Sequence, residues 1–247
     1  APLDKQGMDM NVVENVLKAN KTKNRRLKFV YVVPDFQNPS GVTLSRERRQ
    51  KLLDLADEYE TIVVEDSPYR DLRFGGEPIP MLKAMDRNGF VLSVHTFSKI
   101  LFPGTRLGWI VADKPIMEKL IMAKQPTDLC SPPLTQSIVY EFCRRGLLEP
   151  HFRKIVEVYR KKRDLMINAL EENMPQGSGV DWTYPEGGLF LWVKLPEYMD
   201  TAELFPKAVE KKVAYVVGSA FHFDRSGKNT MRLNFSFPTE EQIEEGI

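Results

Sequence analysis

Short runs of apolar, often β-branched residues alternate with helix-like patterns over the first half of the chain. Such runs predict buried strands, here over residues 28–33, 61–65, 90–94 and 107–111. Between the first two strands, Ser45 is a suitable N-cap for a helix that ends at about Glu60 and carries its apolar residues on one face. Strands separated by helical segments favour a mostly parallel sheet with helices on its faces.

The pattern changes in the second half of the chain. Three helices are predicted first, over residues 116–124, 132–145 and 149–173. Two strands around the turn Glu186-Gly187-Gly188 follow, and then a helix over 201–211 and strands over 213–217 and 231–235. We therefore expect an α/β fold: a mostly parallel-sheet domain over 1–160, followed by a small α+β domain over 161–247.

Composition narrows the class of protein. Hydrophobic residues make up 42% of the 247 residues and charged residues 28%, which is enough for a packed core. A net charge of +1 gives no strong field for nucleic acid or an anionic membrane, and no apolar stretch reaches the roughly 20 residues that span a bilayer. The three histidines show no metal-ligand spacing, so no metal site is expected.

The chain has two cysteines, Cys130 and Cys143, which are too few for a disulfide framework. We expect both to be buried free thiols, since free cysteine is among the most buried residue types. This cysteine usage favours a reducing compartment and therefore a cytoplasmic protein.

Side chains with possible catalytic or binding roles follow the ends of the predicted strands. Ligands of open α/β sheets bind beyond the carboxyl ends of the strands. The segments that follow the first three strands are Asn38-Pro39-Ser40-Gly41, Asp66-Ser67-Pro68-Tyr69 and Thr96-Phe97-Ser98-Lys99, and Pro103-Gly104-Thr105-Arg106 comes next. Taken singly, a lysine is usually a surface residue, an aspartate a cap and an Asn-Pro pair a turn. Their order and spacing together carry the argument.

These motifs, with a late arginine at Arg232, resemble the class I/II aminotransferases, which are fold-type I enzymes dependent on pyridoxal phosphate (PLP). The block Ser98-Lys99-x-x-x-Pro103-Gly104-x-Arg106-x-Gly108 is the most specific part of the match. The chain is most similar to the branch that contains 2-aminoadipate, kynurenine and aromatic aminotransferases. The resemblance extends over essentially the whole chain.

The resemblance implies a role for each residue that would hold the cofactor. Lys99 would carry PLP as a Schiff base and later move a proton. Asp66 would pair with the pyridine nitrogen, and Tyr69 with Asn38 would bind the phenolic oxygen. Arg106, with the hydroxyls of Thr96 and Ser98, would bind the phosphate. Many relatives have serine where this chain has Thr96, and both residues offer a hydroxyl.

The resemblance also implies a reaction. Arg232 would bind the substrate α-carboxylate with the help of Asn38, and an amino group would move from an α-amino acid to a 2-oxo acid such as 2-oxoglutarate. Two alternatives use the same residues. A PLP lyase or synthase has the same scaffold, and some transcription regulators join an aminotransferase-like ligand sensor to a DNA-binding domain.

The family pattern includes an N-terminal stretch that is not found in this sequence. It contains a phosphate-binding helix N-terminus, an aromatic ring that stacks on the cofactor, and a substrate-gating segment. We therefore expect the chain to be a C-terminal fragment that shows little activity by itself. The family also implies a homodimer with small-molecule partners, namely an amino acid and a 2-oxo acid.

Overall fold

The computed structural model describes residues 1–25, 27–175 and 177–247, and it divides the chain into two compact units. Unit 1 comprises Ala1–Asp35, Thr43–Asp71 and Glu77–Lys154. Unit 2 comprises Phe36–Val42, Leu72–Gly76 and Ile155–Ile247. Two short segments of the first half therefore belong to the second unit. The domain boundary expected at residue 160 stays a prediction.

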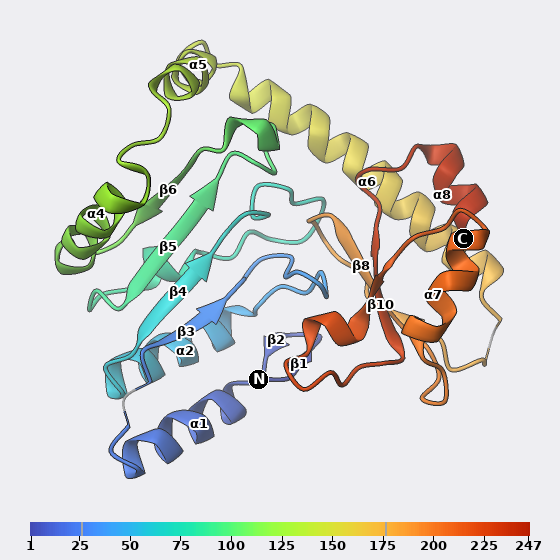
Figure 1. The fold of residues 1–247 in the computed structure, drawn as a ribbon, viewed down its shortest axis with the longest axis horizontal. Helices are drawn as coiled ribbons and strands as arrows, with labels where there is room; N and C mark the ends of the chain where they lie inside the picture. Colours follow the sequence, from blue (N-terminus) through green and yellow to red (C-terminus); the bar gives the residue numbers. More distant parts are fainter. Residues whose placement is uncertain (26, 176) are drawn as a thin grey trace. The chain divides into compact units, whose positions relative to one another are not determined.

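Unit 1 is built on a four-stranded sheet with the order β3-β4-β5-β6 (Figure 1). β3 and β4 are parallel, as are β4 and β5, and β6 is antiparallel to β5. The strands span Phe29–Val32 (β3), Ile62–Asp66 (β4), Val91–Thr96 (β5) and Gly108–Val111 (β6). The mostly parallel sheet expected for the first half is thus present. A small hairpin of β1 (Leu3–Asp4) and β2 (Gly7–Met8) precedes it.

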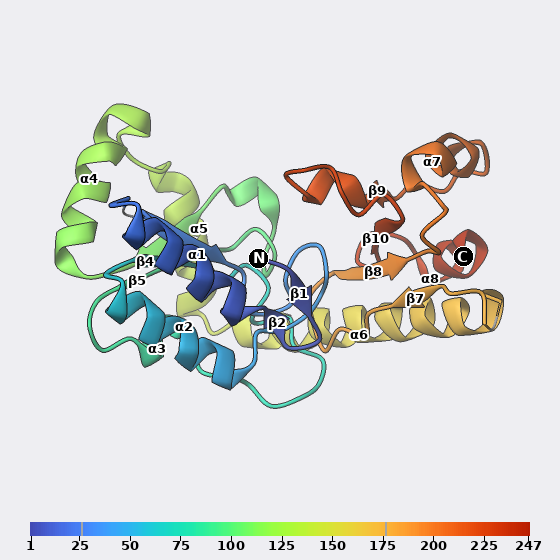
Figure 2. The same ribbon diagram turned by 90° about the horizontal axis from the view of Figure 1, so that it is seen from below.

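Three helices lie on one face of this sheet (Figure 2). They are α1 (Met10–Thr22), α2 (Arg46–Glu58) and α3 (Leu82–Met85). The Ser45 side chain caps α2 by accepting a hydrogen bond from the Arg48 amide, as predicted. Their apolar residues pack with Val63 and Val91, which are completely buried. Burying each such side chain contributes roughly 1.5–3 kcal/mol, so this face is the core of unit 1.

The remaining elements of unit 1 bury little surface. All four residues of β6 are exposed, and every residue of α4 (Lys114–Asp128) is exposed or half-exposed. α5 (Pro133–Arg144) buries Val139. The prediction that Cys130 and Cys143 are buried is wrong: both are free and exposed, because they belong to this poorly covered segment.

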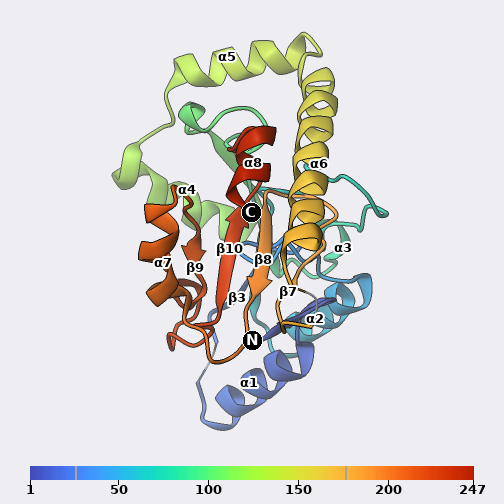
Figure 3. The same cartoon turned by 90° about the vertical axis from the view of Figure 1, so that its right-hand side faces the viewer.

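Unit 2 contains an antiparallel sheet with the order β7-β8-β10-β9 (Figure 3). Its strands are β7 (Asp181–Trp182), β8 (Phe190–Lys194), β9 (Val216–Val217) and β10 (Thr230–Asn234). The helices are α6 (Leu148–Asn173), α7 (Thr201–Glu210) and α8 (Glu240–Gly246), of which α6 begins in unit 1. α6 and α8 bury Met166, Leu170 and Ile243 against β8.

One predicted strand is too long. The apolar run over 213–217 was expected to be a strand throughout, but Val216 and Val217 are the residues that pair with β10. The Tyr215 hydroxyl instead donates to the Thr201 carbonyl at 2.6 Å, which directs this segment toward α7. Among the helices that the structure describes, none is long and apolar enough to cross a membrane.

Candidate functional site

Asp66 is the last residue of β4, where sequence reasoning expected a cofactor-binding carboxylate. Side chains alternate between the two faces of a strand, so Val64 and Asp66 lie on the face opposite Val63 and Glu65. The buried carboxylate of Glu65 accepts hydrogen bonds from the Leu82 and Lys83 amides at 2.7 and 3.0 Å. Glu65 therefore caps α3 on the core face, and Asp66 is directed to the opposite face.

A hydrogen bond from a neighbouring strand fixes the Asp66 carboxylate. The Tyr31 hydroxyl on β3 donates to Asp66 Oδ2 at 2.6 Å. Burial raises the pKa of Tyr31 well above its usual range, and the hydrogen bond to Asp66 raises it further. The hydroxyl therefore remains protonated and donates at any ordinary pH. Sequence reasoning missed Tyr31, because the contact depends on the register of β3 against β4.

Thr96, Ser98 and Lys99 follow one another at the end of β5, the strand next to β4. The Thr96 hydroxyl accepts from the Ser98 amide at 3.1 Å and lies 3.0 Å from the Ser98 hydroxyl. Lys99 is exposed in the next position. Two hydroxyls and an ammonium group thus stand at the same sheet edge as Asp66, because the carboxyl ends of parallel strands meet there.

Arg106 ends a short 3₁₀ turn, η1 (Pro103–Thr105), that leads into β6. Its backbone is left-handed, with φ 48°, which costs about 1 kcal/mol for a residue other than glycine. The Thr105 hydroxyl offsets this cost by donating to the Phe102 carbonyl at 3.0 Å, and the Phe97 amide donates to the Leu107 carbonyl at 3.0 Å. These bonds hold the Arg106 turn beside the end of β5.

The loop after β3 is anchored by a buried ion pair in unit 1. Arg49 on α2 and Asp35 are completely buried and lie 2.8 Å apart, and Arg70 approaches the other Asp35 oxygen at 3.4 Å. Arg49 also donates to the carbonyls of Leu44 and Pro80 at 3.0 Å. Each of the three guanidinium nitrogens thus has a hydrogen-bond acceptor, as a buried charge requires. Tyr69, also predicted for the site, is buried next to Arg70.

The two residues expected to bind substrate meet in unit 2. Arg232, in the middle of β10, donates from Nη1 to Asn38 Oδ1 at 2.7 Å. Its guanidinium also stacks on Phe190, 4.1 Å from the ring centroid, and lies 5.3 Å from the ring centroid of Phe221. Aromatic faces attract guanidinium groups, so these rings restrict the orientation of the cation. Sequence reasoning did not identify Phe190 or Phe221, because rings in apolar runs carry no distinguishing signal.

Asn38 belongs to a segment, Phe36–Val42, that packs within unit 2. Phe36 is completely buried with a left-handed backbone, φ 52°, which is unusual for a bulky residue. A Cβ atom at Gly187 or Gly188 would collide with Phe36, so the absence of side chains there makes room for the ring. The Gly187-Gly188 turn therefore supports the segment that carries Asn38.

Histidine and other potential ligands show no metal chemistry in the described residues. His95 stacks on Trp109 with ring centroids 4.9 Å apart, and its Nε2 lies 3.0 Å from the Ser93 hydroxyl. Burial lowers the pKa of His95, against the opposing effect of nearby Glu65, Asp71 and Asp66. In the part of the chain that the structure describes, no group of three or more His, Cys, Asp or Glu residues could hold a metal ion.

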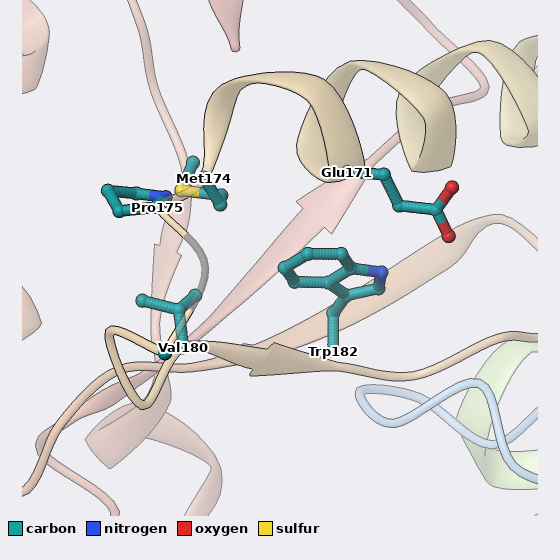
Figure 4. Close-up of a pocket in the computed structure, with 6 residues that line it drawn as sticks. Glu171, Met174, Pro175, Val180 and Trp182 are labelled. Carbon is teal, nitrogen blue, oxygen red and sulfur yellow. The ribbon is translucent and has the colours of Figure 1, made fainter.

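Unit 2 has a surface pocket between the end of α6 and β7 (Figure 4). Trp182 forms one wall, and the Glu171 carboxylate lies at its rim and accepts from the Tyr184 hydroxyl at 3.1 Å. The described residues that line the pocket are Glu171, Met174, Pro175, Gly177, Val180 and Trp182. All of them differ from the predicted site residues.

Comparison with known structures shows the same fold over nearly the whole chain. Pyrococcus horikoshii kynurenine aminotransferase, solved with PMP, KYN and KYA, is 48% identical with a TM-score of 0.95, and the match covers 99% of this chain and 60% of that one. LysN, an α-aminoadipate aminotransferase from Thermus thermophilus complexed with N-(5'-phosphopyridoxyl)-L-leucine, is 36% identical with a TM-score of 0.92 and coverages of 100% and 62%. The predicted fold class, fold type I, is confirmed.

Sequence comparison gives the same result. Aromatic-amino-acid aminotransferase 1 of Thermococcus litoralis is 49% identical over 246 residues, which are 100% of this chain and 58% of that protein. The chain thus spans about three fifths of the length of these relatives. The family pattern described as aminotransferase class I and II matches residues 1–247. The resemblance predicted from the motifs is confirmed, and the chain belongs to the class I and II aminotransferase family.

Proposed function

We propose that the protein is a PLP-dependent aminotransferase that moves an amino group from an α-amino acid to a 2-oxo acid such as 2-oxoglutarate. The observation that carries the proposal is the set of groups at one sheet edge of unit 1: the Asp66 carboxylate at the end of β4, with Thr96, Ser98 and Lys99 at the end of β5. Relatives that are 36–49% identical are named as aminotransferases of aromatic amino acids, kynurenine and 2-aminoadipate, which supports a donor of this kind.

The donor set of unit 1 suits PLP. A carboxylate matches a protonated ring nitrogen, and two hydroxyls 3.0 Å apart, with the nearby Arg106, match a phosphate. Asp66 would hold the ring proton, while Thr96, Ser98 and Arg106 would bind the phosphate. Tyr69 would donate to the phenolic oxygen.

When bound, PLP supplies an electron-accepting ring that stabilises negative charge at the substrate Cα. Lys99 would hold the cofactor through its amine, and after release the same nitrogen would take the proton from Cα. The exposed position of Lys99 at the strand end gives its Nζ the freedom for both tasks.

Arg232 and Asn38 would bind the substrate. The guanidinium fork of Arg232 can pair with a carboxylate through two parallel hydrogen bonds. Because Asn38 Oδ1 already accepts from Arg232, its Nδ2 amino group remains as a donor for the cofactor's phenolic oxygen.

The alternatives receive less support. A lyase or synthase would use the same residues, but the compared relatives are named as aminotransferases. The regulator alternative has relatives too: the HTH-type transcriptional regulator YdfD of Bacillus subtilis is 31% identical over 246 residues. That identity is well below the 49% of the Thermococcus litoralis aminotransferase, so the enzyme is favoured. We further propose a cytoplasmic homodimer, following the family expectation and the cysteine usage.

The test is a half-reaction. The protein over its whole encoded length, loaded with PLP, is mixed with single amino acids without any 2-oxo acid, and absorbance follows conversion to the pyridoxamine form. An aminotransferase converts stoichiometrically with its donor, and 2-oxoglutarate restores the starting spectrum. The proposal is contradicted if no α-amino acid gives this conversion, including aromatic amino acids, kynurenine and 2-aminoadipate.

A further inference from the structure

We propose that Tyr31 is a positioning residue of the cofactor site: its hydroxyl holds the Asp66 carboxylate in the orientation in which it meets the pyridine nitrogen. This inference rests on the proposed function, because it assigns a role to Tyr31 through the carboxylate that would bind the cofactor.

The register of the sheet brings the two side chains together. In the parallel pair of β3 and β4, Tyr31 lies opposite Val64, two residues before Asp66. Residues two apart on a strand share a face, so Tyr31, Val64 and Asp66 lie on the same one. A tyrosine is long enough to reach the diagonal neighbour, and its hydroxyl meets Asp66 Oδ2 at 2.6 Å. Thr96 lies on this face too, since Asp66 pairs with Val94 on β5.

The hydrogen bond leaves one carboxylate oxygen available. Oδ2 accepts from Tyr31, and among the described residues no donor contacts Oδ1. A carboxylate at a strand end otherwise rotates about its terminal bond, since that torsion has a broad, two-fold profile. Holding Oδ2 stops this rotation, and Oδ1 is then presented in one direction. Preorganised charge of this kind acts without reorganisation during a reaction.

The contact also has a fixed direction. Hydrogen bonds donated to a carboxylate are shorter and stronger than those between neutral groups. The raised pKa of Tyr31 means that its proton stays on the phenol. Tyr31 therefore acts as a permanent donor, and the Asp66 carboxylate is the acceptor.

The exposure of Tyr31 argues against a role in packing alone. Its residue surface is 54% exposed, whereas Val63 on the opposite face of the sheet is completely buried. Removing the hydroxyl of a half-exposed ring affects stability little, so the phenylalanine variant is expected to fold. A loss of cofactor binding in that variant would then reflect the missing hydrogen bond.

The first experiment compares Tyr31→Phe with the wild type in the protein over its whole encoded length. We expect PLP to bind about tenfold more weakly, as loss of one hydrogen bond to a charged group predicts. The half-reaction rate should fall while the KM for the amino acid is retained, because Arg232 is unchanged. With PLP labelled with ¹⁵N in the ring, the nitrogen resonance should shift. Tyr198→Phe, at an 87% exposed position, is the matched control and should change none of these.

The second experiment is a double-mutant cycle with Asp66→Asn. If Tyr31 acts through Asp66, adding Tyr31→Phe to Asp66→Asn weakens PLP binding by less than about twofold, because the carboxylate is already gone. A further loss of about tenfold in that background means that the two residues act independently, and it overturns the inference.

The outcomes separate the two proposals. A wild type that neither binds PLP nor converts with any amino acid contradicts the proposed function. A wild type that does both, with a Tyr31→Phe variant equal to it in PLP affinity and ring-nitrogen resonance, contradicts the role of Tyr31 and leaves the proposed function intact.

Discussion

In unit 1 the residues proposed to hold the cofactor stand at strand ends and in loops, whereas in unit 2 Arg232 stands inside a strand that is paired on both edges. Within the described strands, Asp66 is paired with β5 alone and Thr96 with β6 alone, so these side chains need additional support. Tyr31 supports Asp66, and the Thr96 hydroxyl fixes the Ser98 amide. For Arg232 the backbone is already fixed, and Asn38 with Phe190 restricts only the guanidinium.

This difference predicts that substitutions in the two units affect different steps, namely cofactor binding and substrate binding. The cofactor groups of unit 1 depend on side-chain contacts, so single substitutions there should affect cofactor binding and chemistry. In unit 2, Arg232 has a proposed role toward the substrate alone, so its substitution should affect affinity for the amino acid and leave cofactor binding unchanged. Four substitutions follow in order of expected effect. Lys99→Ala and Arg232→Lys test this division between the units, and Arg49→Met and His95→Gln test what stabilises unit 1.

Lys99→Ala should abolish the reaction. Loss of both the covalent attachment and the proton-transferring amine should lower the half-reaction rate by more than about 10³-fold. Rapid-mixing absorbance measures this rate. Lys119→Ala removes another exposed lysine of unit 1 and should retain the wild-type rate. Measurable turnover near the wild-type rate in Lys99→Ala would remove Lys99 from the proposed site.

Arg49→Met should destabilise unit 1 by about 3–5 kcal/mol, because it leaves Asp35 buried without its main cation. Urea unfolding gives the free energy of unfolding. Arg46→Met, at an exposed position of the same helix, should change it by less than about 0.5 kcal/mol. An unfolding free energy equal to that of the control would show that the loop after β3 does not need this anchor.

Arg232→Lys keeps the charge but loses the planar fork. We expect kcat/KM for every α-amino acid to fall about 100-fold, mainly through KM, because paired charge-assisted hydrogen bonds are lost. PLP affinity should match the wild type. Arg225→Lys, in an exposed loop of unit 2, is the control and should be neutral. A parallel loss of PLP affinity in Arg232→Lys would contradict the division between the units.

His95→Gln should have the smallest effect of the four. The quantity that it changes is the pH dependence of the free energy of unfolding. Burial lowers the pKa of His95 below its ordinary 6.5 in the folded protein. As the pH falls, the unfolded chain therefore binds this proton before the folded protein does. The part of the folding stability that is present above pH 6.5 is lost as the pH falls through the pKa of the folded protein. Urea unfolding without cofactor at about pH 7.5 and about pH 5.5, on either side of the ordinary histidine pKa, should show a smaller decrease in the variant. His222→Gln, an exposed control, should keep the wild-type decrease.

Several parts of the fold and the proposed site followed from local patterns. Strand ends could be predicted because apolar runs stop at prolines and polar turns, and this placed Asp66 and Lys99 at the edge of the sheet. The cap at Ser45 followed from its side-chain oxygen. Each of these inferences uses neighbours within a few residues.

Features that depend on distant residues could not be predicted in this way. The contact of Tyr31 with Asp66 needs the register of β3 against β4, which no local pattern encodes. The segment Phe36–Val42 packs in unit 2 because Gly187 and Gly188, far along the chain, leave room for Phe36. The exposure of Cys130 and Cys143 reflects how little surface α4 and α5 bury, although their sequences are apolar enough for a core.

The exposed edge strand β6 has a practical consequence for preparing this chain. Trp109, Ile110 and Val111 present apolar side chains beside a row of backbone groups that can pair with another strand. Edges of this kind promote association between molecules. A preparation of the chain should therefore be kept dilute, and a charged residue at Ile110 is the simplest change for improving its solubility.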